Sequence, residues 1–405
     1  MREEYFNGRF VNSITHRKSS MFQKDFELHG DHLRNAYENK CILVIGAAGT
    51  IGTSTVFKIL GKNPKNLILI DSNENALVEL IRLIQLKRDF RRTTSITPIV
   101  LDVTGRLFDR MAKTLPQIDI VLNFAAIKHV RSERDISSVL RMMEVNVLAT
   151  KRIVELAKRQ DNCRLFSVST DKAANPVNLM GASKRLMEAT MFSELMLDAM
   201  SARFANVAFS NGSLLDSWAR RIYEKSPIAF PHNTKRYFIS MEESGQLCLM
   251  AAGLLGKSEI GIPNLGEGLE PTLLENALCD YLSELKIKPI FVDNEDEAVE
   301  MSSTQNFMTA EQVVIRTDLD TIGEKSIEEF VGSGDVRVDS NFRSIEIIKA
   351  PDLDGNRLNE FCELIEGALI DDSFAIDVPM IVERIQELIP TFSHAVSSTS
   401  LDNRI

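Results

Sequence analysis

The sequence predicts an α/β fold, a doubly wound parallel sheet with a smaller C-terminal α/β lobe. Short apolar runs such as Cys41–Ile45 lack polar alternation, as strands buried on both faces do. Segments of helical periodicity separate these runs, and strand-helix-strand repeats are typical of parallel sheets. After about residue 210 this alternation stops and the irregular stretches become longer. The chain therefore divides into a sheet domain and a second lobe interleaved with it.

Six strands are expected in the sheet domain, with amphipathic helices between them. A long helix is predicted over 138–160, and another begins near Gly181. The expected strands are Cys41–Ile45, Asn66–Ile70, Thr97–Leu101, Ile118–Leu122, Arg164–Val168 and Ala202–Phe209.

The second lobe gives a weaker pattern. Residues 227–231 are expected to turn the chain, and the acidic stretch 293–305 to form a surface loop. Helices are predicted over 217–224, 241–255, 356–369 and 378–388, and strands over 235–239 and 287–292. The resulting division is a polar, irregular N-terminal extension (1–39, with a short helix around 31–39), the sheet domain (40–210), the second lobe (211–350), C-terminal helices (351–392) and a flexible Ser-rich tail (393–405).

Composition narrows the class of protein. With 405 residues, 44% hydrophobic and 26% charged, the chain is an ordinary globular protein with a large core. A net charge of −10 without a compensating basic run argues against nucleic-acid binding. No apolar stretch reaches the roughly 18 residues that a membrane span needs, and the N-terminus is too polar for a signal peptide. The five scattered cysteines predict reduced thiols in the cytoplasm rather than disulfides or a metal site.

A glycine-rich turn, G-A-A-G-T-I-G over 46–52, joins the first strand to an amphipathic helix. Glycines at these spacings permit a tight turn, let the backbone approach a pyrophosphate and let the helix pack on the strand. The helix N-terminus offers N–H groups and a positive dipole end to phosphates. The arrangement predicts a Rossmann-like dinucleotide-binding domain, with cofactor contacts from Gly46, Gly49, Thr50, Ile51 and Gly52.

The following strands supply the remaining cofactor contacts. Asp71 ends the second strand at the spacing where a carboxylate accepts hydrogen bonds from the adenosine ribose. A carboxylate there repels a 2′-phosphate, and no basic residue follows at once, so NAD is favoured over NADP. The alternatives are a helix-capping role for Asp71 and a reach of the basic segment 87–92 to a 2′-phosphate. Asp102 and Val103 are expected near the adenine, and Ala125, Ala126, Asn146 and Lys184 beside the rest of the cofactor.

The stretch from Ser169 to Lys184 reads S-T-D-K-A-A-N-P-V-N-L-M-G-A-S-K and carries the strongest chemical signal. Thr170, Asp171 and Lys172 follow a buried strand, so they lie at its C-terminal end, where open α/β sheets bind ligands. A loop comes next, and the helix after it carries Lys184. An acid and two amines in one cleft form a site that can move protons.

Together, G-A-A-G-T-I-G, N-F-A-A-I-K-H-V, the 169–184 stretch and K-R-Y-F-I-S-M-E-E resemble the extended short-chain dehydrogenase/reductases. Among these, the chain is similar to the nucleotide-sugar 4,6-dehydratases of the polysaccharide-biosynthesis group, over roughly residues 22–388. The resemblance implies NAD as cofactor, a UDP-linked N-acetylhexosamine (most often UDP-GlcNAc) as substrate, and a homo-oligomer. Longer members of the group carry N-terminal membrane helices, and this chain looks like a soluble, truncated form without them.

The resemblance also implies residue roles in making a 4-keto-6-deoxy sugar. Hydride leaves C4 for NAD⁺, a base removes the C5 proton, an acid protonates the departing C6 hydroxyl, and hydride returns to C6. Asp171 would be the acid at O6, Lys172 the base at C5, and Thr170 the partner of O4. Lys184 would hold the nicotinamide ribose. Because a basic lysine needs a lowered pKa, burial and the neighbouring Lys184 are expected to lower the pKa of Lys172.

Met180 departs from the usual signature, which places a tyrosine four residues before the lysine as the base for the C4 hydroxyl. A thioether takes no proton at any relevant pH, so another group must act at O4. One subgroup of these dehydratases shares the methionine. Our hypothesis is that Asp171 also takes the O4 proton.

The candidates for substrate binding lie outside this stretch. Arg236 is the expected diphosphate ligand, because a guanidinium binds such oxygens bidentately, and a solvated surface arginine is the alternative. Lys128, Asn206 and Ser213 are weaker candidates. His129 is expected to pack beside the cleft, and general-base catalysis by it is the less favoured alternative.

Two other functions fit the same fold. A 4-epimerase or a C5-inverting dehydratase shares the C4 oxidation, but an epimerase needs no acid–base pair at C5 and C6, which Asp171 and Lys172 provide. A catalytically silent dinucleotide-binding scaffold would explain the missing tyrosine, but it would have no reason to keep all of Asp171, Lys172 and Lys184. Helices over 138–160 and 183–200 have apolar faces that suit either a subunit interface or core packing.

Overall fold

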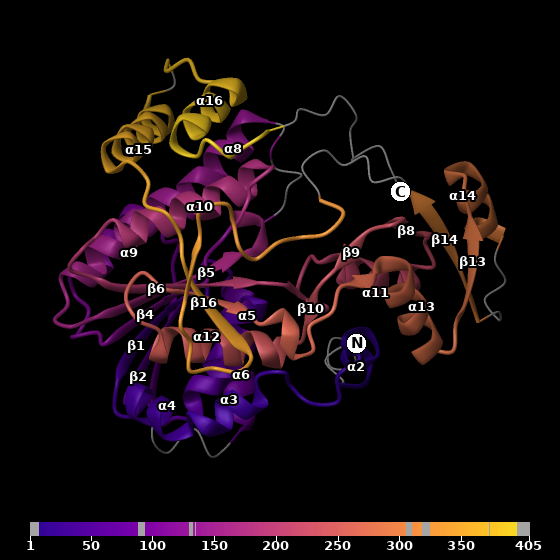
Figure 1. The fold of residues 1–405 in the computed structure, drawn as a ribbon, viewed down its shortest axis with the longest axis horizontal. Coiled ribbons are helices and arrows are strands. Elements are labelled where there is room, and N and C mark those ends of the chain that lie inside the picture. The colour runs from indigo at the N-terminus through magenta and orange to yellow at the C-terminus, as the bar shows by residue number, and fades with distance from the viewer. Residues whose placement is uncertain are drawn as a thin grey trace.

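A computed structural model describes residues 8–87, 94–128, 133, 135–304, 310–317, 325–371 and 373–394. Within them, a nine-stranded sheet forms the centre, in the order β15-β16-β11-β6-β5-β4-β1-β2-β3 (Figure 1). The strands from β3 to β11 pair in parallel, and β16 and β15 add an antiparallel edge. The order 3-2-1-4-5-6 is that of doubly wound dinucleotide-binding sheets, so the predicted fold class is confirmed. The strands are β1 Cys41–Ile45, β2 Asn66–Asp71, β3 Ser95–Val100, β4 Ile120–Asn123, β5 Arg164–Thr170, β6 Asp198–Phe204, β11 Ile260–Pro263, β15 Val336–Val338 and β16 Ile345–Lys349.

The sixth strand of the sheet exists, but the bounds predicted for it, 202–209, are wrong. β6 ends at Phe204, and Asn206–Val207 form β7, which pairs in parallel with β10 (Phe238–Ile239) outside the main sheet. Phe209 then has a φ of 55°, a left-handed conformation that no strand continues through. The chain therefore leaves the central sheet at the point where the second lobe begins.

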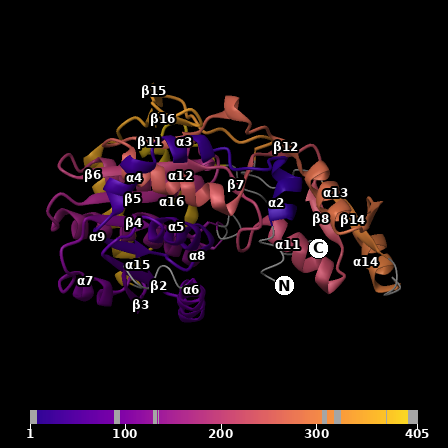
Figure 2. The same cartoon turned by 90° about the horizontal axis from the view of Figure 1, so that it is seen from below.

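Helices cover both faces of the sheet (Figures 1 and 2). On one face, α5 (Thr50–Leu60) packs closely against α12 (Met241–Leu254). On the other face, α9 (Ala149–Lys158) and α10 (Leu179–Phe192) lie over β5. The remaining helices of this domain are α6 Glu74–Leu86 and α7 Arg106–Ala112. None of the helices in the described residues is long and apolar enough to cross a bilayer.

The long helix predicted over 138–160 is interrupted. α8 (Ile136–Met143) runs into a π-helical turn, Glu144–Leu148, before α9 begins. Such turns occur frequently at functional sites, and this one holds Asn146.

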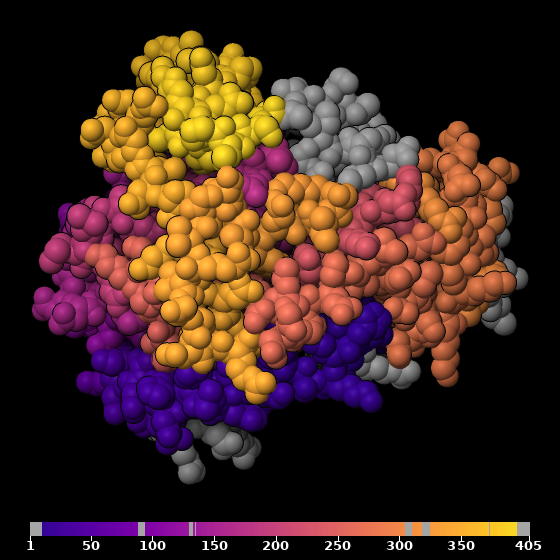
Figure 3. Space-filling view, in the orientation of Figure 1, coloured from indigo at the N-terminus to yellow at the C-terminus, as the bar shows by residue number. Residues whose placement is uncertain are grey.

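The C-terminal helices α15 (Gly355–Ile370) and α16 (Val378–Leu388) confirm two predicted helices and sit together over α8 and α10, the yellow cap of Figure 3. Phe361 of α15 and Ile385 of α16 share one core cluster with residues of α8 and α10. The helix expected over 183–200 ends at Phe192, and residues 198–200 belong to β6. The apolar faces of α8 and α10 pack in the core of this chain.

The second lobe contains a three-stranded parallel sheet in the order β13-β14-β8. β13 (Lys288–Val292) was predicted, but β8 (Ile228–Pro231) replaces an expected turn. The acidic stretch expected as a loop contains α14 (Glu295–Thr304), because acidic residues in a first turn favour the positive helix N-terminus. The other elements are β9 Lys235–Arg236, α11 Leu214–Glu224, β12 Thr272–Leu273, α13 Leu274–Glu284 and β14 Glu311–Thr317.

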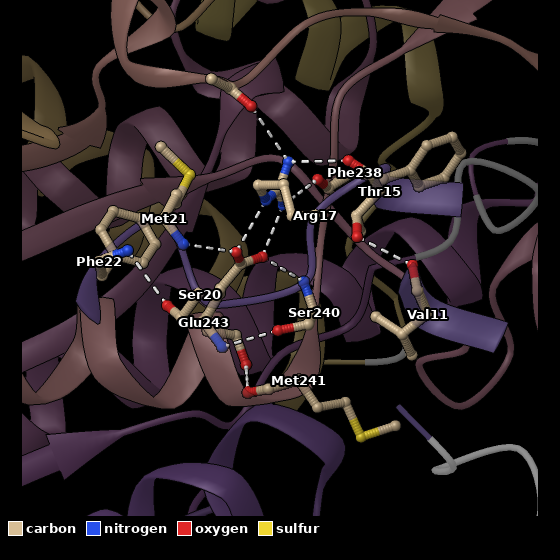
Figure 4. A network of polar contacts seen from close by, with 12 residues as sticks. Val11, Thr15, Arg17, Ser20, Met21, Phe22, Phe238, Ser240, Met241 and Glu243 are labelled. Carbon is tan, nitrogen blue, oxygen red and sulfur yellow. Dashed lines mark hydrogen bonds and ion pairs between the residues drawn. The ribbon is translucent and has the colours of Figure 1, made fainter. Parts of the chain in front are cut away.

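The N-terminal extension is more ordered than expected and joins the two lobes. α2 (Gly8–Thr15) packs against α13 of the second lobe. Arg17 then donates from Nε and Nη2 to the carboxylate of Glu243 in α12, at 2.9 and 2.6 Å, and from Nη2 to Phe238 O at 2.9 Å (Figure 4). The Arg17 guanidinium thereby ties the extension to α12 over the central sheet and to β10 outside it. Two further helices, α3 Gln23–Leu28 and α4 Gly30–Tyr37, complete the extension.

Candidate active site

Residues 171–178, here called the catalytic loop because they include candidate catalytic residues, begin where β5 ends, and the first three form a 3-10 turn. Thr170 Oγ1 donates to Asp171 Oδ1 at 2.8 Å and accepts from Lys172 N at 3.4 Å. Asn178 caps α10 by accepting from Gly181 N at 2.8 Å. A Cβ on Gly181 would lie 2.4 Å from Lys172 O, so glycine lets α10 pack directly on the turn. The structure therefore brings Thr170, Asp171 and Lys172 together, as predicted.

Asp171 is buried, and its two carboxylate oxygens differ. Oδ1 accepts from Thr170 Oγ1, from Lys172 N at 2.9 Å and from Lys172 Nζ at 3.4 Å. Oδ2 is buried and has no hydrogen-bond partner among the described residues. A buried carboxylate oxygen without a partner costs free energy, which favours a ligand hydroxyl as the missing donor.

The pKa of Lys172 differs from the expectation. Its ammonium lies 3.0 Å from Glu328 Oε1 and 3.4 Å from Asp171 Oδ1. Burial does lower the pKa of Lys172, but these two carboxylates outweigh it, and the net effect raises that pKa above the usual value. The expected lowering is wrong, because an ionic partner from a distant segment was not foreseen.

Lys184, unlike Lys172, has a lowered pKa. Its ammonium donates to Val168 O at 2.8 Å and contacts Met187 Sδ at 3.3 Å. Burial lowers the pKa of Lys184 to about 8, against the opposing charge of Glu188. The side chain therefore joins α10 to β5 next to the catalytic loop.

Met180 is 5% exposed and belongs to the core cluster beneath α15 and α16. Its backbone N–H donates to Glu133 Oε1 at 2.8 Å, and that of Leu179 to Oε2 at 2.9 Å. Glu133, which the sequence did not single out, therefore caps α10 beside Asn178. The apolar packing of Met180 agrees with a side chain that handles no proton.

The glycine turn fits a dinucleotide. Gly46 has a φ of 72°, and a Cβ there would lie 2.7 Å from Ala125 N. A Cβ on Gly52 would lie 2.3 Å from Gly46 O. Gly49 is the N-cap of α5 and supplies no side-chain acceptor, so the first-turn N–H groups can face phosphate oxygens. Thr50 and Ile51 begin this turn of the helix.

Asp71 lies against the glycine turn, and its Oδ1 accepts from Asn73 N at 2.9 Å. Its Oδ2 accepts from Ala48 N at 2.9 Å. Asp102, expected near the adenine, is bound at 2.6 Å by Arg141. Burial raises the pKa of Asp102, but hydrogen bonds from Thr104 and Arg141 bring it below the usual value. Val103 is buried beside it.

Asn146 organises the loop after β4. Its side chain exchanges hydrogen bonds of 2.9 Å with the backbone of Ile127 and donates to Ser183 Oγ at 2.8 Å. The residue thus links the loop that carries Ala125 and Ala126 to α10. Its amide binds these protein groups in the structure.

The candidates for substrate binding are dispersed. Lys128 Nζ donates to Asn211 O at 2.6 Å, while Asn211 N donates to Thr50 Oγ1 at 3.1 Å. Ser213 caps α11, Asn206 Nδ2 donates to Tyr237 O at 3.3 Å, and Arg236 Nη1 donates to Lys325 O at 2.9 Å. His129 and the basic residues 88–92 lie outside the described part of the chain.

A buried charge cluster beside the catalytic loop was also missed. Arg203 pairs with Glu188 at 2.9 Å and with Asp335, and all three side chains are almost fully buried. These three charged residues are far apart in the sequence and belong to no recognisable motif, so the sequence does not indicate that they meet. Glu328, the ion-pair partner of Lys172, was missed for the same reason.

The fold and the similarity to known proteins place this chain among the extended short-chain dehydrogenase/reductase enzymes. Residues 42–350 match the family described as polysaccharide biosynthesis protein, and the chain belongs to that family.

Relatives of this chain carry several names. An uncharacterized membrane protein, MJ1061, of Methanocaldococcus jannaschii is 31% identical over 64% of this chain and 76% of its own length. The probable polysaccharide biosynthesis protein EpsC of Bacillus subtilis is 28% identical over 84% of this chain but 53% of its own length, so the chain spans about half of it. A UDP-N-acetylglucosamine 4,6-dehydratase (inverting) of Campylobacter jejuni is 26% identical over 68% of this chain and 81% of its own.

Solved structures show the same fold. Pen from Bacillus thuringiensis superposes with a TM-score of 0.61 at 21% identity, over 78% of this chain and 89% of that one. DesIV, a dTDP-glucose 4,6-dehydratase from Streptomyces venezuelae, gives 0.53 at 16% identity, over 72% and 88%.

Proposed function

We propose that this protein catalyses the NAD-dependent 4,6-dehydration of a UDP-linked N-acetylhexosamine, first of all UDP-GlcNAc, in the synthesis of a surface polysaccharide or glycan. The observation that carries the proposal is Asp171 Oδ2, buried without a partner beside Thr170 and Lys172. A carboxylate held in this way is suited to proton transfer with a sugar hydroxyl. The dehydratase named among the relatives supports the choice of reaction and of sugar.

The cofactor proposal depends on the glycine turn and Asp71. NAD⁺ bound there would accept hydride from C4 of the sugar and return it to C6. Thr170 would orient O4, and Asp171 would take the O4 proton and deliver it to the C6 hydroxyl, which leaves as water. Lys184 would hold the nicotinamide ribose. The C5 proton must then pass to the remaining pair, Lys172 and Glu328.

Substrate contacts would come mainly from the second lobe. Arg236 is 7% exposed on β9, where its charge acts on both Lys172 and Glu328. We assign it the diphosphate, because a cation so close to the catalytic groups would bring the sugar to them. Lys128, Asn206 and Ser213 remain weaker assignments.

The test is incubation of the purified protein with UDP-GlcNAc in deuterated water, followed by mass spectrometry and NMR of the sugar. Loss of one water, deuterium at C5 and a new methyl group at C6 are expected. The variant Asp171→Asn should lose turnover and still bind NAD, because it keeps the shape of the side chain but removes the acid. If neither UDP-GlcNAc nor a panel of other nucleotide sugars loses water, the proposal fails and a silent dinucleotide-binding scaffold takes its place.

A further inference from the structure

Residues 325–335, here called the clamp segment, lie directly against the catalytic loop. Asn175 Nδ2 donates to Glu329 Oε2 at 2.8 Å, and Ser333 N donates to Asn175 Oδ1 at 2.8 Å. A Cβ on Gly332 would lie 2.0 Å from Ala174 O, so the two backbones are in contact. The clamp segment is therefore fixed to the loop that carries Asp171.

The other side of the clamp segment is fixed as well. Lys235 N donates to Ser326 O, and Arg236 Nη1 to Lys325 O, both at 2.9 Å. Arg203 donates from the sheet to Phe330 O at 3.0 Å. Side chains held by such a framework keep one position, as catalytic groups need to.

These contacts place Glu328 next to Lys172. Its side chain is 3% exposed, and Oε1 lies 3.0 Å from Lys172 Nζ. The same ammonium lies 3.4 Å from Asp171 Oδ1, so it stands between two carboxylates. A lysine in this position is held protonated and cannot accept a proton. The base has to be a carboxylate.

We propose that Glu328 removes the proton from C5 of the sugar, and that the Lys172 ammonium stabilises the negative charge that develops next to it. This rests on the dehydration proposed above. Breaking the C5–H bond sends the proton to Glu328, and its electron pair forms the C5–C6 double bond. The C6–O bond breaks, and the hydroxyl leaves as water with the proton held by Asp171. The proton on Glu328 exchanges with solvent, and Glu328 then delivers a solvent-derived proton to C5 when hydride is added to C6, so every group ends as it began.

The electrostatics of Glu328 agree with this role. Burial raises its pKa above the usual range, and the charge of Asp171 adds to that effect against the opposing charge of Lys172. A general base works best when its pKa lies near the working pH. The pH dependence also separates the two possible bases. A Glu328 base loses activity as the pH falls through its raised pKa, whereas a Lys172 base gains activity only as the pH rises toward alkaline values.

The test compares Glu328→Gln with Glu329→Gln. Both remove one carboxylate from adjacent positions of the clamp segment, but the Glu329 side chain points to Asn175 and Lys325 and is 54% exposed. In deuterated water with UDP-GlcNAc, Glu328→Gln should slow deuterium incorporation at C5 and water loss by about 100-fold or more, with KM little changed. It should still reduce bound NAD in the first half-reaction. Glu329→Gln keeps a side-chain oxygen that can accept from Asn175 Nδ2 and should slow the reaction by only a few fold. Glu328→Asp should recover part of the rate lost in Glu328→Gln.

A second readout needs no substrate or cofactor. In the ligand-free protein, NMR titration of ¹³C-labelled lysine should show a lower pKa for Lys172 in Glu328→Gln than in Glu329→Gln. If Glu328→Gln incorporates deuterium at C5 as fast as Glu329→Gln, Glu328 is not the base. If the wild type itself turns over no nucleotide sugar, it is the dehydration that fails, and the two failures are distinct.

Discussion

The Glu188 carboxylate and the Arg203 guanidinium form a fully buried pair beside the catalytic loop, with 2.9 Å between Oε2 and Nη2. A second hydrogen bond of 2.9 Å joins Nε to Oε1, and Ser169 Oγ donates to the same oxygen at 2.6 Å. The pair connects α10, β6 and the end of β5. The position of Thr170 and Asp171, which follow Ser169, therefore depends on the buried Glu188–Arg203 pair.

The variant Glu188→Gln should lower the free energy of unfolding by about 3–5 kcal/mol, because it leaves the buried Arg203 charge poorly compensated. Urea denaturation followed by circular dichroism measures this. The control is Glu155→Gln, which breaks the exposed Lys158–Glu155 pair and should change stability by less than about 1 kcal/mol. Similar losses in both variants would contradict the structural role of the buried pair.

Lys184 should make stability depend on pH. Its pKa is about 8 in the folded protein and near the usual 10.5 in the unfolded chain. Between these values the unfolded chain binds more protons, so this group makes the folded protein more stable as the pH rises, by up to about 3 kcal/mol. Below pH 8 the full cost of burying the charge is present.

The measurement compares the wild type with Lys184→Met, which keeps the length of the side chain and removes the charge. The stability of the variant relative to the wild type should be highest at about pH 7 and should decline toward about pH 10. If this stability difference does not vary with pH, the buried Lys184 ammonium does not destabilise the folded protein, and the prediction is wrong.

Local signals were enough to predict that the strands β1 to β6 exist, but not β11, β15 and β16, which come from later in the chain. β1 and the glycine turn form one contiguous strand-turn-helix pattern, and the steric reason for Gly52 lies within the turn itself, since its Cβ would lie 2.3 Å from Gly46 O. The grouping of Thr170, Asp171 and Lys172 followed from the rule that ligands bind at the C-terminal ends of parallel strands. These inferences need no knowledge of remote contacts.

The features that could not be predicted from the sequence depend on contacts between residues far apart in the chain. The pKa of Lys172 was predicted in the wrong direction because Glu328 arrives from the clamp segment, which nothing near Lys172 reveals. Likewise the sequence predicts a turn where β8 lies, because this segment forms a strand only by pairing with β14. The apolar faces of α8 and α10 suited either an interface or a core until α15 and α16 were seen to cover them.

The glycine turn allows stability and cofactor binding to be separated. Gly49 has a φ of −68°, and a Cβ there would meet only Gly46 O at 3.5 Å, so Gly49→Ala should fold normally. Its added methyl group would face the pyrophosphate, and NAD affinity should fall about tenfold or more. Gly52→Ala should instead cost about 1–3 kcal/mol of stability, because its Cβ would lie 2.3 Å from Gly46 O. Calorimetric NAD titration and thermal unfolding measure the two effects, and equal NAD affinity in Gly49→Ala and wild type would contradict the assigned phosphate site.

Met180 tests whether the position usually occupied by tyrosine takes part in proton transfer. Its side chain is buried in the cluster formed with α15 and α16, so Met180→Leu conserves volume and polarity and should cost less than about 1.5 kcal/mol of stability. Because Asp171 is assigned the O4 proton, kcat for the dehydration should stay within a few fold of the wild type. Rapid-quench measurement of water loss from the nucleotide sugar gives this rate, with Asp171→Asn as the inactive control. A fall in Met180→Leu as large as that in Asp171→Asn, with the fold intact by circular dichroism, would show that the thioether has a function in the reaction that apolar packing does not explain.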